Sequence, residues 1–107
     1  MHPSVVVVTG GGRGIGRAIC ARFAADGDQV VAASRTSAEL DQTRTIIERA
    51  GGRCHSHVTD VGLADDVHAL VETTVGRFGR LDVLVNCAGI APPAKIEELD
   101  PSLFETI

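Results

Sequence analysis

A glycine-rich turn between a run of valines and a helical pattern constrains the fold of this chain more than any other feature. Residues 5–20 read VVVVTGGGRGIGRAIC, with five glycines among residues 10–16. A glycine loses more conformational freedom than any other residue when it is fixed. Such a turn is therefore expected only where the backbone needs positive φ angles or where a ligand comes close to it. The valine run is typical of a strand buried on both faces, because it is short, continuous and β-branched. The segment predicts a strand, a tight turn and a helix in that order.

Strand and helix patterns alternate along the rest of the chain. The predicted strands cover residues 5–8, 29–34, 53–58 and 81–86. The third of these, RCHSHV, is polar, which places it at an edge of the sheet rather than in the doubly covered centre. Because strands and helices alternate, the chain is predicted to form one α/β unit with a parallel sheet and right-handed crossovers.

The helices between the strands are predicted from apolar residues at helical spacing. Ile15, Ile19 and Phe23 recur every four residues and mark the expected buried face of the first helix. The helix before the fourth strand is expected over residues 65–78. A further helix is expected to begin at Asp100, because an aspartate followed by a proline is typical of a helix start.

Composition argues against nucleic-acid and membrane partners. The formal net charge is -4 and the pI is near 5.4, with no cluster of basic residues, which argues against general nucleic-acid binding. The longest uninterrupted aliphatic run, residues 5–8, is far shorter than the roughly 20 apolar residues that cross a bilayer. We therefore expect a cytoplasmic protein that does not associate with membranes.

The cysteines and histidines carry no signature of a disulfide or a metal site. Cys20, Cys54 and Cys87 are odd in number and widely spaced, which is typical of reduced thiols. His55 and His57 stand two apart, but no carboxylate or thiol lies at a recognisable ligand spacing from them. No metal site is predicted.

The first strand, the glycine turn and the first helix together predict an anion site. A helix that follows such a turn presents backbone N–H groups and the positive end of its dipole, which suit a phosphate. A P-loop requires Lys and then Ser or Thr after its last glycine, whereas Gly16 is followed by Arg17 and Ala18. The fingerprint G-x-G-x-x-G also fails, and the spacing that fits is G-x-x-x-G-x-G at Gly10, Gly14 and Gly16. The alternative is that the glycines only form a tight connection between strand and helix.

With Thr9 before it, this turn resembles that of the short-chain dehydrogenase/reductase family, a Rossmann family that uses a nicotinamide dinucleotide. Two more motifs agree: TDV at residues 59–61 follows the third strand, and VNCAG at residues 85–89 follows the fourth. The second resembles the family's Asn-Asn-Ala-Gly, with Cys87 in place of the second Asn. The resemblance covers residues 1–107 and identifies them as a single dinucleotide-binding unit. This unit is similar to the amino-terminal part of the family, truncated before the catalytic half.

The resemblance implies a Rossmann-type doubly wound parallel sheet in a three-layer α/β/α arrangement, here partial, with strand order 3-2-1-4. The ligand crevice of such a sheet lies at the carboxyl ends of the strands, where the order reverses between the first and the fourth. No fifth strand is expected, so the apolar strand at residues 81–86 would form a bare edge. Such an edge favours pairing with other chains, and we therefore expect the isolated chain to self-associate, aggregate or unfold partly, and allow for a homo-oligomer.

The same resemblance implies where a dinucleotide contacts the chain. In the family an acid after the third strand meets adenine, which assigns that role to Asp60. Asp60 could instead cap the following helix or do both, and Asn86 could simply satisfy backbone groups. The candidate cofactor-binding residues are Gly10, Arg13, Gly14, Ile15, Gly16, Ser34, Arg35, Asp60, Val61, Asn86, Ala88 and Gly89.

The residues at the end of the second strand predict the choice of dinucleotide. At this place an acidic side chain suits the ribose 2'-hydroxyl of NAD, and an arginine suits the 2'-phosphate of NADP. The chain has Ser34 and Arg35 there. Arg13, inside the turn, resembles the second basic residue of NADP-preferring family members. NADP is therefore the expected cofactor, with NAD as the alternative.

The catalytic side chains of the family, a Ser and a Tyr-x-x-x-Lys, have no counterpart in this sequence. The chain contains no Tyr, and its only lysine, Lys95, lies outside any such motif. The resemblance thus implies the NADP-binding part of an oxidoreductase that reduces a small-molecule carbonyl or oxidises an alcohol by hydride transfer. The 107 residues alone are expected to be inactive. The alternatives are a noncatalytic dinucleotide-binding module, an inactive truncated product, and a degraded reading frame with no ordered ligand site.

Overall fold

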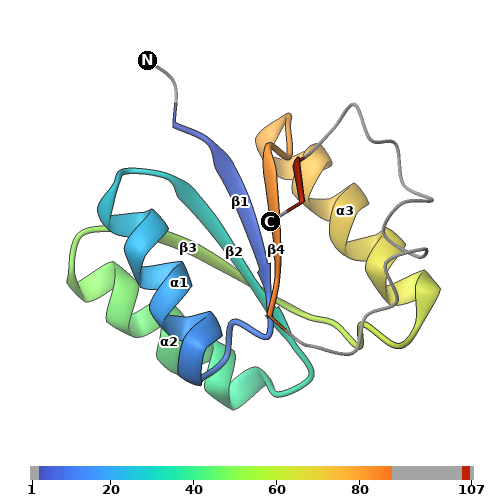
Figure 1. The fold of residues 1–107 in the computed structure, drawn as a ribbon, viewed down its shortest axis with the longest axis horizontal. Coiled ribbons are helices and arrows are strands. Elements are labelled where there is room, and N and C mark those ends of the chain that lie inside the picture. Colours follow the sequence, from blue (N-terminus) through green and yellow to red (C-terminus); the bar gives the residue numbers. More distant parts are fainter. Residues whose placement is uncertain (1–2, 88–104, 107) are drawn as a thin grey trace.

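A computed structural model describes residues 3–87 and 105–106, in which strands and helices alternate (Figure 1). The strands are β1 (Val5–Thr9), β2 (Gln29–Ser34), β3 (Arg53–Val58), β4 (Val83–Asn86) and β5 (Glu105–Thr106). The helices are α1 (Gly14–Ala25), α2 (Ser37–Arg49) and α3 (Ala64–Phe78). The predicted α/β alternation is confirmed.

The strands form one parallel sheet in the order β3-β2-β1-β4-β5. The predicted order 3-2-1-4 is therefore confirmed. The prediction that β4 is a bare edge is wrong, because β5 pairs with it in parallel. In this pairing Val83 lies opposite Glu105, and Leu84 lies opposite Thr106. Two residues are too few to show a strand pattern in the sequence. They also fall in the segment for which a helix from Asp100 was predicted, and Asp100 itself lies outside the described residues.

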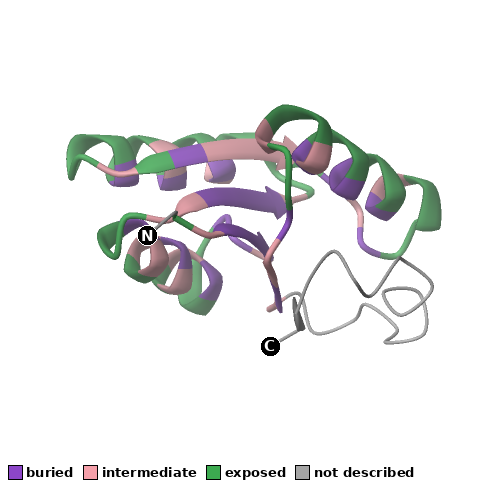
Figure 2. Cartoon of the chain, turned by 90° about the horizontal axis from the view of Figure 1, so that it is seen from above, coloured by how far each residue is buried: buried purple, intermediate pink, exposed green. Residues whose placement is uncertain are grey.

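Helices cover both faces of the sheet. α1 and α2 lie on one side and α3 lies on the other, which gives three layers (Figure 1). Cys20 and Leu40 belong to the apolar cluster beneath α1 and α2, and Leu70 belongs to the cluster beneath α3. Figure 2 shows buried strands between helices whose outer surfaces are exposed. The predicted α/β/α arrangement is confirmed.

β1 lies at the centre of this core, and all of its residues are buried. Val6 and Val8 pack beneath α1 and α2, whereas Val7 packs beneath α3. Since both faces of β1 are covered, a polar side chain at any of these positions would lie in the apolar core. The uninterrupted valine run follows from this double coverage.

The buried face of α1 is shifted by one position along the helix from the predicted one. Its buried residues are Gly16, Cys20 and Ala24, whereas Ile15 is 77% exposed. Ile19 and Phe23 are only partly buried, at the margin of the cluster. The predicted stripe is wrong because α1 lies very close to the sheet and the turn. At the contact line this approach selects small side chains rather than the largest apolar ones.

β3 forms one edge of the sheet, as its polar sequence predicts. The His55 ring packs on Phe78 of α3 with ring centroids 6.1 Å apart. Burial, together with the positive charge of Arg77, lowers the pKa of His55. Within the described ranges, no group of three or more His, Cys, Asp or Glu side chains is placed to hold a metal ion. Over the same residues, no helix has the length and apolar character that a bilayer crossing requires.

Candidate functional site

A cavity of about 470 Å³ opens at the carboxyl ends of the strands. Its walls come from the glycine turn after β1, the connection from β2 to α2, the loop after β3, and Cys87 after β4. The lining residues that the sequence predicted are Gly10, Arg13, Gly14, Ile15, Gly16, Ser34, Arg35, Asp60 and Val61. The lining residues that sequence reasoning missed are Gly12, Thr36, Glu39, Thr59 and Cys87. The fold therefore brings the glycine turn, the end of the second strand and the TDV motif to one cavity.

Each glycine of the G-x-x-x-G-x-G spacing has its own structural reason. Gly10 and Gly14 have φ angles of 73° and 58°, a region in which other residues are strained. Gly16 lies inside α1, where a Cβ atom would stand 1.8 Å from the carbonyl oxygen of Gly10. The helix and the turn are in direct backbone contact at this point, and only glycine permits so close an approach.

The amino end of α1 borders the cavity. Its N-cap residue, Arg13, makes no side-chain cap hydrogen bond, and the first turn contains no acidic residue. The N–H groups in the first turn of a helix have no partners within the helix. Here that turn, Gly14–Gly16, lines the cavity, and the Ile15 side chain is exposed beside it. Free donors and the positive end of the helix dipole suit an anion such as a phosphate.

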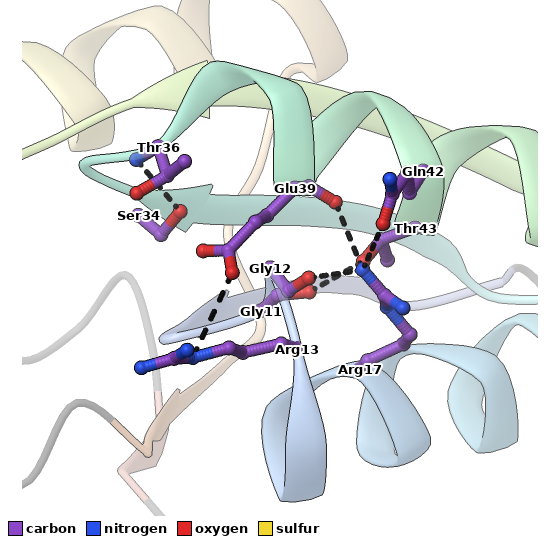
Figure 3. Close-up of polar contacts among 9 residues, drawn as sticks. All are labelled: Gly11, Gly12, Arg13, Arg17, Ser34, Thr36, Glu39, Gln42 and Thr43. Carbon is purple, nitrogen blue, oxygen red and sulfur yellow. Dashed lines mark hydrogen bonds and ion pairs between the residues drawn. The ribbon is translucent and has the colours of Figure 1, made fainter.

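Arg17 and Thr43 fasten the turn to α2 (Figure 3). The buried Thr43 hydroxyl donates to the carbonyl oxygen of Gly11 at 2.8 Å. It accepts a hydrogen bond from Arg17 Nε at 2.9 Å. Arg17 also donates to the carbonyl oxygens of Gly12 and Glu39. These bonds satisfy the turn carbonyls on the side of α2, so the turn and the start of α2 are held in one arrangement.

Thr43→Val is expected to lower the free energy of unfolding by about 1–3 kcal/mol, since the new side chain fills the same space but leaves the Gly11 carbonyl without its hydroxyl donor. Thr74→Val is the matched control, because the buried Thr74 hydroxyl donates to the Leu70 carbonyl of its own helix. That carbonyl keeps its helical N–H partner, so the control should lose less than about 1 kcal/mol. Urea unfolding followed by circular dichroism measures both. Equal losses would contradict the role given to Thr43.

Arg13 and Arg35 bring positive charge to the side of the cavity next to α2. Arg13 Nε lies 3.7 Å from a carboxylate oxygen of Glu39. Over the described residues, no carboxylate lies within ion-pair distance of Arg35. The Ser34 hydroxyl accepts a hydrogen bond from the Thr36 N–H at 3.3 Å. This part of the cavity can therefore hold a second anionic group, separate from the one at the amino end of α1.

Asp60 lines the cavity and does not cap α3. The N-cap residue of α3 is Leu63, which makes no side-chain cap hydrogen bond. Asp60 Oδ1 instead accepts a hydrogen bond from the Gly62 N–H at 2.9 Å, and the Asp60 N–H donates to Asp66 at 2.8 Å. Asp66, in the first turn of α3, thus fixes the loop that carries Asp60. The helix-cap alternative is wrong.

The motif after β4 is only partly described. Asn86 is not among the lining residues, and its side-chain oxygen accepts a hydrogen bond from the Thr9 hydroxyl at 3.0 Å. This bond joins the carboxyl ends of β1 and β4, and its donor is a side-chain hydroxyl rather than one of the backbone groups that the alternative assigned to Asn86. Ala88 and Gly89 lie outside the described residues.

The three thiols are free, as their spacing predicts. Burial raises the pKa of Cys20 to about 12 and that of Cys54 to about 11. Burial also raises the pKa of Cys87, which lines the cavity. Because the thiolate is the reactive form of cysteine, none of these side chains is activated as a nucleophile at neutral pH.

A family model and the curated relatives agree with the resemblance drawn from the sequence motifs. A family model described as "short chain dehydrogenase" matches residues 4–107. The short-chain reductase protein NovJ of Streptomyces niveus is 51% identical over 81% of this chain and 33% of its own length. The glucose and ribitol dehydrogenase homolog 2 of Arabidopsis thaliana is 32% identical over 100% of this chain and 39% of its own length. This chain therefore spans about a third to two fifths of the length of these curated relatives.

Solved structures are similar over the same part. A metagenomic short-chain oxidoreductase in complex with NADP matches with a TM-score of 0.74 and 38% identity, over 77% of this chain and 37% of that one. A short-chain dehydrogenase/reductase from Burkholderia phymatum in complex with NAD matches with a TM-score of 0.75 and 31% identity, over 78% of this chain and 30% of that one. The similarity thus reaches proteins solved with either dinucleotide.

Proposed function

Because the chain belongs to the short-chain dehydrogenase family, we propose that it binds a nicotinamide dinucleotide and prefers NADP to NAD. In this proposal residues 1–107 form one dinucleotide-binding unit of an oxidoreductase that acts on a small-molecule carbonyl or alcohol. The observation that carries it is the cavity between the uncapped amino end of α1 and the basic residues near α2.

The residues of the cavity fit the pyrophosphate of such a cofactor. The first turn of α1 offers uncapped N–H groups. The non-bridging oxygens of a pyrophosphate accept hydrogen bonds from such donors. A Cβ atom built on Gly14 would meet no heavy atom within 4 Å, so open space adjoins the helix start. A ligand can therefore approach the backbone at this point without displacing a side chain.

The remaining residues fit the adenosine end of the dinucleotide. We assign the 2'-phosphate to Arg13, Ser34 and Arg35, and the adenine to Asp60 and Val61. The proposed site also contains Gly10, Gly14, Ile15 and Gly16, together with Asn86, Ala88 and Gly89 after β4.

The chain's own part in the chemistry is to bind and orient the cofactor. When bound, the nicotinamide supplies a hydride to a carbonyl or accepts one from an alcohol. The chain itself has no Tyr that could pass a proton to or from the substrate oxygen. The second candidate is a noncatalytic dinucleotide-binding module, which the same cavity would serve. The two candidates share the cavity and differ in whether a longer chain adds a catalytic half.

Arg35→Asp tests the assignment of the 2'-phosphate. We expect NADP affinity to fall about 10-fold or more, or ~1.4 kcal/mol, because the substitution replaces attraction with repulsion at a dianionic group. NAD affinity should stay within about two-fold, since NAD lacks that group. Isothermal titration calorimetry measures both dinucleotides.

Arg49→Asp is the matched control, because Arg49 is exposed in the last turn of α2 and does not line the cavity. It should leave the ratio of the two affinities unchanged. If the chain binds neither dinucleotide, the proposed function is wrong. If Arg35→Asp leaves the ratio unchanged, the role of Arg35 is wrong.

A further inference from the structure

A carboxylate, Glu39, lies in the same part of the cavity as the basic residues assigned to the 2'-phosphate. Glu39 belongs to the first turn of α2 and lines the cavity with Arg13 and Arg35. Its side chain is 32% exposed. A phosphate bound to the two arginines would therefore meet a like charge, and like charges at close range oppose binding.

The backbone of Glu39 is held in place. Its carbonyl oxygen accepts a hydrogen bond from Arg17 at 3.2 Å, and the next residue, Leu40, is 1% exposed in the core. A Cβ atom on Gly12 would stand 3.1 Å from the Cβ of Glu39, so the glycine turn packs directly against the stem of this side chain. Glu39 can move its carboxylate by side-chain rotation, but it cannot leave the cavity without breaking these contacts.

The carboxylate of Glu39 forms an ion pair with the guanidinium of Arg13. Figure 3 shows the two side chains extending toward one another beside the glycine turn. Arg13 Nε lies 3.7 Å from Glu39 Oε2. The Arg13 side chain is 81% exposed, and over the described residues Glu39 is the only carboxylate within ion-pair distance of it. An incoming phosphate has to compete with Glu39 for the Arg13 guanidinium.

We propose that Glu39 is a specificity-determining residue that weakens the binding of a 2'-phosphorylated dinucleotide relative to the unphosphorylated one. The inference rests on the proposed function and deepens it. Glu39 acts in two ways: it repels the phosphate directly, and it holds Arg13 in an ion pair that the phosphate must break. The preference for NADP over NAD is therefore smaller than Arg13 and Arg35 would produce in the absence of Glu39.

A purely structural role for Glu39 predicts a different result. An acidic residue in the first turn of a helix stabilises that helix through the dipole. Such a role would change the stability of the fold and leave the discrimination between the two dinucleotides untouched. The ratio of NADP affinity to NAD affinity therefore separates the two roles.

The test compares Glu39→Gln with Glu48→Gln by isothermal titration calorimetry with NADP and NAD. Glu48 is the matched control because it lies on the same helix and pairs with an arginine, Arg44, at 3.8 Å, but does not line the cavity. Glu39→Gln should tighten NADP binding roughly 3- to 5-fold and leave NAD binding within about two-fold, in line with the strength of an exposed ion pair. Glu48→Gln should change neither. Glu39→Ala serves as a second variant with the same charge change.

Repeating the comparison in an Arg13→Gln variant measures how much of the effect of Glu39 on NADP affinity depends on its ion pair with Arg13. In that background Glu39→Gln should tighten NADP binding less than it does in the parent chain, because no guanidinium is released. If the parent chain binds both dinucleotides but Glu39→Gln leaves NADP affinity unchanged or lowers it, the inference is overturned and the proposed function stands. If no variant and no parent chain binds either dinucleotide, the proposed function is overturned and the inference falls with it.

Discussion

Gly16→Ala is expected to abolish dinucleotide binding and to lower the free energy of unfolding by about 3 kcal/mol or more. The added Cβ would stand 1.8 Å from the Gly10 oxygen and 2.6 Å from the Gly10 carbonyl carbon. Both are backbone atoms, so no side-chain rotation relieves the overlap, and α1 has to move away from the turn. Since a domain is stabilised by only about 5–15 kcal/mol, a loss of this size is a large share of the total.

Gly76→Ala is the matched control for this substitution. Gly76 also lies within a helix, α3, but a Cβ there would meet no heavy atom within 4 Å. The control should gain about 0.5–1 kcal/mol, because alanine is the better helix former. Urea unfolding by circular dichroism and titration with NADP measure the two effects. A Gly16→Ala variant that unfolds and binds like the parent would show that the turn and α1 do not touch as described.

The chain alone is expected not to transfer a hydride at an enzyme-like rate, even when saturated with NADPH. Reduction of a carbonyl needs a proton donor within hydrogen-bond reach of the oxygen, and general acid–base help is typically worth ~100- to 10,000-fold. The sequence has no Tyr. His55 packs on Phe78, and His57 bonds to Thr59 without lining the cavity itself. Cys87 does line it, but burial raises its pKa and makes its thiol a weaker acid.

Loss of NADPH absorbance with a panel of ketones and aldehydes measures this rate. A longer chain that carries a Ser and a Tyr-x-x-x-Lys after these residues is the positive control. NADPH binding to the 107-residue chain is measured in the same buffer, so that a missing reaction is not mistaken for missing cofactor. Robust turnover by the loaded 107-residue chain would overturn the prediction.

The parts of the fold that the sequence predicts well are those fixed by local pattern. The ranges predicted for β2 and β3 agree with the structure, because each is bounded by turn residues. The strand order also agrees, since the resemblance implies it and the alternation of elements supports it. The errors have a different origin. The face of α1 depends on how closely the helix approaches the turn, and β5 consists of two residues whose pairing depends on β4 being nearby.

The residues of the candidate site also fall into two groups: those that the local sequence identifies, and those that depend on contacts between distant segments. Gly10 and Gly14 could be selected from spacing alone, because their φ angles demand glycine. Glu39 could not, since it stands among ordinary residues of a helical pattern and reaches the cavity only through the position of α2. That position is set by contacts of Arg17 and Thr43 with the turn, which join residues far apart in the sequence. The sequence shows an acid in the first turn of the helix that follows Arg35, but not that this acid faces the cavity.

Because β1 lies at the centre of the sheet, its two edges find their partner strands at different times during synthesis. One edge of β1 pairs with the next strand to be made, β2, but the other pairs with β4. The Val5 N–H, for example, donates to Asp82, 77 residues later. At about 5–20 residues per second, ribosomes need roughly 4–15 s to add that many residues. The layer beneath α1 and α2 is built mainly from segments that emerge first. After β2 is made and until β4 is made, β1 has one open edge, which nascent-chain chaperones are suited to cover.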